Sequence, residues 1–121
     1  MKYILLIHAN PATVTGRSEA ETMKVYAEID AITKELSESG ELIGGEVLAD
    51  VSQSKVVRVT GGVPVTTDGP FVEAKEHLAG YLIVETDSEQ RAIDIAARWP
   101  DASEGGAMEV RPIMDIGGTE M

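Results

Sequence analysis

The sequence predicts a single α+β domain in which two helices cover one face of a small sheet. Three observations predict it. A length of 121 residues amounts to one domain with a real core. Apolar segments of strand length and two amphipathic helical patterns follow one another in the order strand, helix, strand, and that order occurs twice. Between the two halves, two β segments flank a Gly-Gly pair, which predicts an inserted hairpin.

The first half of the chain is predicted to be a strand, a helix and a strand. The continuous apolar run 3–7 predicts the first strand. Ser18 and Glu21 form a capping-box pattern, and apolar residues then recur at helical spacing, so we expect a helix over residues 19–38. Residues 42–48 predict the second strand, whose Gly-Gly pair suits a β-bulge.

The hairpin comes next. Residues 56–60 and 63–67 have the composition of strands, and Gly61-Gly62 between them suits a two-residue turn. Pro64 lacks a backbone donor, which places the second arm at an edge or in a short ribbon.

The second half repeats the pattern of the first. Residues 78–85 predict a strand, and residues 86–88 supply caps for a helix that ends near Trp99. The last strand is expected over residues 108–114, where apolar and polar positions alternate. This element order is the split βαβ pattern of a ferredoxin-like α+β sandwich with a β-hairpin insertion.

The predicted helices leave one sheet face uncovered. Val, Ile and Leu are too frequent in the strands for that face to stay wet, so we expect a homodimer that packs sheet against sheet. Tyr26 and Trp99 lie at helical core spacing and are expected to pack against the covered face.

The composition limits the partners, cofactors and cellular locations that we expect for this chain. A net charge of −11 with no basic cluster disfavours nucleic acid and anionic membranes. The absence of cysteine excludes disulfides and thiolate sites and suits the cytoplasm. No signal peptide and no apolar run of membrane-spanning length is found. No phosphate loop or dinucleotide motif is present, so no cofactor is expected.

The densest polar cluster follows the turn Asp68-Gly69-Pro70-Phe71. Asp68, Glu73 and His77 are the candidate catalytic residues, because carboxylates beside an imidazole suit acid/base chemistry. Asp68 has the alternative role of bonding its own turn. Glu73 and His77 would share a face if residues 72–78 were helical, and the alternative to an acid/base pair is that this helical turn is solvated.

Four further residues are candidate ligand-binding groups: His8, Tyr81, Glu109 and Arg111. His8 ends the first strand and either points into a cleft or bonds the backbone. Tyr81, Glu109 and Arg111 would supply polar groups to an apolar cavity if they faced the interior of a dimeric barrel. Glu109 and Arg111 have the alternative of an ordinary ion pair. A metal site needs three or four matched ligands, and this supply is too small, so none is expected.

The chain resembles the DGPF group of YCII-related proteins over nearly its whole length. The resemblance rests on the N-terminal Met-Lys-Tyr-Ile-Leu-Leu-Ile, on Thr-Asp-Gly-Pro-Phe-Val-Glu-Ala-Lys-Glu from Thr67, and on Gly80-Tyr81 after it. It also includes Ala-Ala-Arg-Trp-Pro from Ala96 and Met-Glu-Val-Arg-Pro from Met108. The order and spacing of these segments make the resemblance specific.

The resemblance implies a dimeric ferredoxin-like α+β barrel in a cytoplasmic bacterial protein. Relatives are often encoded or fused beside extracytoplasmic-function sigma factors, which makes a sigma factor an implied partner. The wider group resembles small-lactone isomerases, for which a His/Asp pair is proposed, with the His on the first helix. The predicted helix 19–38 contains no histidine, so that pair has no counterpart in this chain.

The sequence is compatible with two functions. The first is a small-ligand-binding or accessory protein without catalysis, in a sigma-factor regulatory context. The second is a cofactor-free isomerase or lyase that moves a proton on a small cyclic substrate, with Asp68, Glu73 or His77 as acid and base. We expect the second if these side chains line a cavity and the first if all three face solvent.

Overall fold

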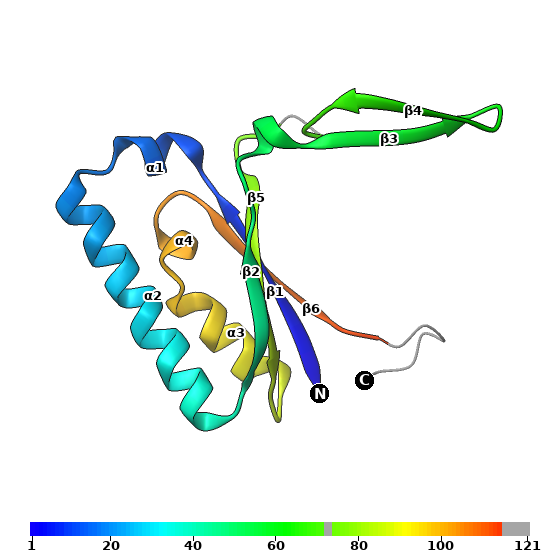
Figure 1. Ribbon diagram of the computed structural model, residues 1–121. Coiled ribbons are helices and arrows are strands. Elements are labelled where there is room, and N and C mark those ends of the chain that lie inside the picture. Colours follow the sequence, from blue (N-terminus) through cyan, green and yellow to red (C-terminus); the bar gives the residue numbers. More distant parts are fainter. Residues whose placement is uncertain (72–73, 115–121) are drawn as a thin grey trace.

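A computed structural model describes residues 1–71 and 74–114 of the chain (Figure 1). Six strands and four α-helices follow one another, together with one short 3-10 helix, η1. They are β1 (Lys2–Ala9), α1 (Pro11–Gly16), α2 (Glu19–Ser39), β2 (Leu42–Val47), η1 (Val51–Gln53), β3 (Lys55–Thr60), β4 (Val63–Asp68), β5 (His77–Glu85), α3 (Glu89–Arg98), α4 (Pro100–Ser103) and β6 (Ala107–Pro112).

The main sheet has four strands in the order β2-β5-β1-β6, and every neighbouring pair is antiparallel. The second strand of each half is thus at an edge and the two inner strands are β1 and β5. This order, with α2 and α3 on one side (Figure 1), confirms the predicted ferredoxin-like α+β fold class. Strands β3 and β4 form a separate two-stranded ribbon, as the Gly61-Gly62 turn predicts.

Helix α2 begins and ends where local chemistry requires. The Ser18 side chain accepts from the Glu21 backbone N–H at 3.1 Å, and Glu21 Oε1 accepts from the Ser18 N–H at 3.4 Å, so the predicted capping box is present. Gly40 ends the helix with φ of 81°, a left-handed conformation that glycine adopts without strain. One helix face is buried and contains Val25, Ile32 and Leu36, of which Ile32 and Leu36 belong to the core cluster that includes the sheet.

The core lies between the helices and the inner strands. Leu5, Leu36, Val84 and Ile95 have the largest fully buried side chains. Trp99 is 5% exposed and joins this core, which confirms its predicted packing.

The corresponding prediction for Tyr26 is wrong. Its side chain is 63% exposed. Because successive helical residues differ by about 100° around the axis, burying Val25 turns its neighbour Tyr26 toward solvent.

Two short helices were not predicted, although a local signal exists for one. Asn10 Oδ1 accepts from the Ala12 N–H at 3.0 Å, and Pro11 occupies the first turn, so α1 has a favourable start.

The predicted bulge at the glycine pair of β2 is confirmed by a register shift between Leu42 and Gly44.

Within residues 1–71 and 74–114, no further layer covers the sheet face opposite the helices. Ile4, Leu6, Tyr81 and Ile83 lie on it in two adjacent cross-strand rows, Ile4 beside Ile83 and Leu6 beside Tyr81. All four are partly buried. We call this surface the open face.

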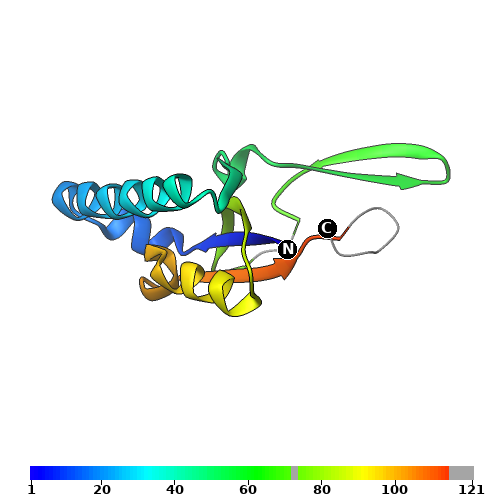
Figure 2. The same ribbon diagram turned by 90° about the horizontal axis from the view of Figure 1, so that it is seen from below.

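The ribbon of residues 55–68, which we call the arm, projects from the end of the sheet on the side away from the helices (Figures 1 and 2). Among the described strands, its two strands pair only with each other. Within 1–71 and 74–114, no helix combines the length and apolar character needed to cross a membrane.

Candidate functional site

A pocket of about 600 Å³ lies where the arm leaves the sheet. The end of β1, the start of β5, the segment 48–54 and the base of the arm enclose it. Most of its lining is apolar: Leu48, Ala49, Val51, Val56, Pro70, Phe71, Ala74 and Leu78. An apolar cavity with a few polar groups at its wall is the usual form of a small-molecule site.

Both histidines of the chain line this pocket. They are distant in sequence, but antiparallel pairing of β1 with β5 sets His8 opposite Leu78 and Ala9 opposite His77. A register shift between Ile7 and His8 marks a bulge at this end of the pair. Strand pairing therefore brings to the same end of the sheet two residues that the sequence placed in different candidate sets, and alternation along the strands starts their side chains on opposite faces.

His8 has a carboxylate partner on the neighbouring strand. Its Nε2 donates to Glu109 Oε1 at 3.3 Å, and the His8 side chain is 30% exposed. The other oxygen of Glu109 is in an ion pair with Arg111. The hydrogen bond from Arg111, and next that from His8, lower the pKa of Glu109 below its ordinary range. Glu109 is therefore an anion that accepts the Nε2–H of His8 and so orients the His8 ring.

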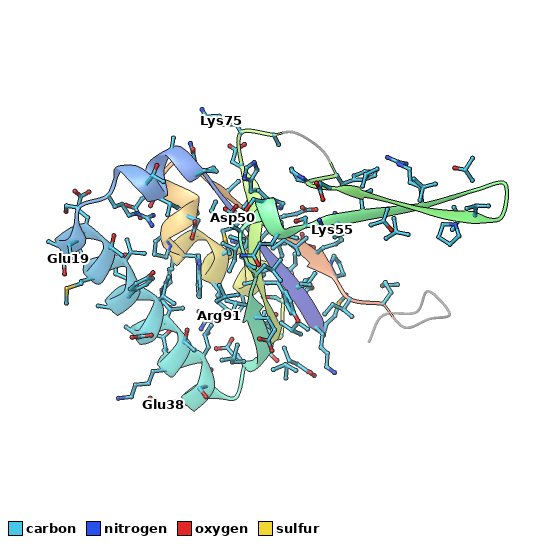
Figure 3. All side chains as sticks on the ribbon, turned by 45° about the horizontal axis from the view of Figure 1, so that its top comes forward. Glu19, Glu38, Asp50, Lys55, Lys75 and Arg91 are labelled. Atoms are coloured by element: carbon cyan, nitrogen blue, oxygen red, sulfur yellow. The ribbon has the colours of Figure 1, made fainter. Side chains whose placement is uncertain are left out.

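His77 has an acidic neighbour that sequence reasoning missed. Asp50 caps η1 by accepting from the Ser52 N–H at 3.0 Å. Hydrogen bonds from Ser52 and then the charge of His77 lower the pKa of Asp50. Asp50 and Lys55 both line the pocket, and Figure 3 shows them near the point where the arm begins. The Asp-Val-Ser order of an Asx turn was the available signal.

Asp68 lies outside the pocket lining. Its side chain is 82% exposed and forms an ion pair with Lys55 on the facing arm strand. The turn after it is held instead by the Gly69 N–H, which donates to the Ser54 carbonyl at 2.9 Å. The catalytic assignment of Asp68 stays a prediction.

The predicted pairing of Glu73 with His77 needs a helix over residues 72–78. Residues 74–76 are not helical and His77 begins a strand, so the described part of this segment does not have that geometry. Glu73 itself lies outside the described residues. Of the three candidate catalytic residues, only His77 is placed by the structure at the pocket wall.

The four candidate ligand-binding residues share one face of the sheet. Leu6 is opposite both Tyr81 and Glu109, Ile4 is opposite Arg111, and His8 lies two positions beyond Leu6. All four therefore lie on the open face, although only His8 lines the pocket.

A smaller pocket of about 300 Å³ lies against α1 and shares the wall of residues 48–51 with the first. His77 borders both pockets. In the part of the chain that the structure describes, no three imidazole or carboxylate groups gather as a metal site would require.

Three comparisons place the chain among known proteins. The family described as "YCII-related domain" matches residues 1–117. An uncharacterized protein of Rhizobium meliloti (strain 1021) is 28% identical over 114 residues, which span 93% of this chain and 92% of that protein. Among solved structures, 5-chloro-2-hydroxyhydroquinone dehydrochlorinase from Burkholderia phenoliruptrix AC1100, in complex with 2,5-dihydroxybenzoquinone, aligns with a TM-score of 0.58. It is 15% identical to this chain, and the alignment covers 99% of this chain and 100% of the dehydrochlorinase. At that identity the likeness shows the fold alone.

Proposed function

This chain belongs to the YCII-related domain family, and we propose that it binds a small cyclic molecule in the pocket between His8 and His77. The observation that carries the proposal is the convergence of both histidines of the chain on one largely apolar pocket of about 600 Å³. A volume of this size suits a ligand of drug-like dimensions or smaller.

The wall chemistry indicates which ligands fit. Apolar side chains suit the flat faces of a ring, while His77 and Lys55 supply N–H donors for ring oxygens. His8, whose Nε2–H is bonded to Glu109, offers its other ring nitrogen. Asp50 and Glu76 add carboxylates that accept from a hydroxyl group. A ring that carries hydroxyl or carbonyl oxygens therefore matches the pocket better than a purely apolar or a highly charged molecule.

The two histidines make binding simple to measure. In an NMR spectrum each imidazole gives its own signals, and the variants His8→Gln and His77→Gln assign them. We expect titration with 2,5-dihydroxybenzoquinone, the ligand of the structural neighbour, to move both sets of signals. Each variant should weaken binding, whereas Tyr26→Phe on the exposed side of α2 should not. If neither imidazole responds to this probe or to simple hydroquinones and phenols, the proposal is wrong.

A second function is favoured by one specific contact, that of His8 with Glu109. An imidazole whose ring is held in position by a carboxylate is suited to general acid/base chemistry. In this reading the His8 nitrogen that is not bonded to Glu109 removes a proton from a ring carbon or oxygen. Return of that proton to another ring position makes the reaction an isomerisation, whereas departure of a leaving group with its bonding electron pair, as the ring forms a new double bond, makes it a lyase reaction. That the structural neighbour is a dehydrochlorinase fits this reading, at the level of fold.

Deuterium exchange separates the two functions. With catalysis, the ring C–H protons of a bound hydroxyquinone should exchange with D₂O faster in the presence of protein, and His8→Gln should abolish the gain. Glu109→Gln should reduce the exchange rate while leaving probe affinity nearly unchanged, because Glu109 acts through His8. Binding without accelerated exchange would leave the ligand-binding function and exclude catalysis on these probes.

We also propose that two copies pair through their open faces. Ile4, Leu6 and Ile83 form an apolar surface there that no part of the described chain covers. Light scattering should report twice the 12.9 kDa chain mass, and a monomer at all concentrations would contradict the pairing. A cytoplasmic location and an association with sigma factors stay predictions from the resemblance.

A further inference from the structure

The arm is the least explained part of this fold. In the part of the chain that the structure describes, its strands β3 and β4 pair only with each other. A two-stranded hairpin alone is marginally stable in water at best. Both of its faces are apolar, because Val57 and Val59 alternate along β3 with Arg58, while Val63 and Val65 project beside Arg58 on the other face. These four valines are between 45% and 66% exposed.

The direction in which the arm projects indicates which neighbour it can contact. It leaves the sheet on the side of the open face, away from α2 and α3 (Figures 1 and 2). A strand of six residues spans about 20 Å, whereas two packed sheets lie about 10 Å apart. If a second copy packs its sheet on the open face, that sheet lies within reach of the arm. The arm is long enough to extend beyond it.

Charge also favours this neighbour. Between Ser54 and Thr67 the arm contains only basic charges, Lys55 and Arg58, whereas the whole chain has a net charge of −11. Lys55 is neutralised by Asp68 at the base of the arm. The guanidinium of Arg58 stacks at 5.0 Å over the Phe71 ring. Because Lys55 is neutralised, Arg58 gives the otherwise apolar arm its net positive charge. An apolar, positively charged ribbon is complementary to the acidic body of a second copy.

We propose that the arm clasps the body of a second copy of this chain, and that this contact holds one wall of the pocket in place. The inference rests on the proposed pairing of open faces. Lys55 and Val56 belong both to the arm and to the pocket lining, and Phe71 joins the arm to the pocket through its contact with Arg58. A partner that holds the arm therefore also holds this wall of the pocket. As a result, ligand binding in the pocket and dimer formation favour each other.

Two arm variants with matched controls test the proposal by sedimentation equilibrium. Val59→Lys puts a charge on the apolar arm, and Met23→Lys makes the same kind of change on α2 at a side chain that is also 66% exposed. Arg58→Glu reverses the charge of the arm, and Lys34→Glu makes an equal change of net charge on α2. We expect each arm variant to raise the dimer dissociation constant at least about tenfold and each control to leave it near the wild-type value.

A second readout excludes simple unfolding. Circular dichroism should show the main sheet and helices intact in the arm variants, because the arm strands pair only with each other. The His77 imidazole signals of the wild type should shift with protein concentration as dimers form, and those of Val59→Lys should remain at the dilute value.

The outcomes separate the two proposals. If the wild type dimerises and both arm variants dimerise equally well, the clasp is wrong and the open-face dimer stands. An arm that binds a different protein would give this same result and would also overturn the clasp. If the wild type is a monomer at all concentrations, both the dimer and the clasp are wrong.

Discussion

The substitution Glu41→Gln should remove a doubly hydrogen-bonded ion pair between Glu41 and Arg91. Arg91 binds Glu41 through two hydrogen bonds, from Nε at 2.8 Å and from its terminal nitrogen at 2.9 Å. These bonds, and that of Ser39, lower the pKa of Glu41 from 4.5 to about 2. The pair joins the start of α3 to the residue before β2.

The size of the effect follows from this pKa. A fall from 4.5 to about 2 corresponds to about 3 kcal/mol of stabilisation. Solvent screens the pair, because the Glu41 side chain is 19% and the Arg91 side chain 38% exposed. We therefore expect Glu41→Gln to lower the free energy of unfolding by about 1–2 kcal/mol near neutral pH.

The pH dependence gives an independent check. The folded-state pKa lies below the unfolded-state value, so the ion pair contributes fully above pH 4.5, and this contribution is lost as the pH falls toward about 2. Urea unfolding should therefore show a difference between wild type and Glu41→Gln that shrinks over this window. Glu38→Gln makes the same charge change at an exposed site nearby. Equal losses in the two variants, or a Glu41→Gln difference that stays constant as the solution is acidified, would refute the reasoning.

Three further changes test the fold and the site. Ser18→Ala removes the α2 cap and should cost about 1 kcal/mol of unfolding free energy, which Ser18→Asp should largely retain. Leu36→Ala leaves a cavity at a fully buried position and should cost about 2–5 kcal/mol by urea unfolding. Gly106→Ala would place a Cβ too close to the His8 carbonyl oxygen, so the pairing of β1 with β6 must shift. The NMR signals of the His8 imidazole should therefore move. Unchanged signals would contradict this close approach.

Much of the fold was predictable because its signals are local. The capping box at Ser18, the Gly61-Gly62 turn and the alternation before Pro112 each depend on a few neighbouring residues. Tyr26 was misplaced because helical spacing gives a periodicity without showing where the buried sector ends, and the sheet beneath α2 decides that limit.

The candidate site was predictable only in part. His8 and His77 were identified as chemically able residues, but they were assigned to different groups. Lys55 and the segment 48–54 were missed because ordinary loop and strand residues become pocket walls only when the chain returns to them. The pairing of Glu73 with His77 depended on a helix over residues 72–78, whereas His77 begins a strand.

The sequence by itself determined the order of the elements, the family and the presence of an uncovered apolar sheet face, since these follow from patterns within short segments. Only the tertiary structure decided that His8 and His77 share a pocket, that Glu109 supports one imidazole and Asp50 lies near the other, and that the arm projects beside the open face. The physical reason is strand pairing: the β1–β5 register joins residues almost seventy positions apart, and such a register depends on the packing of the whole sheet.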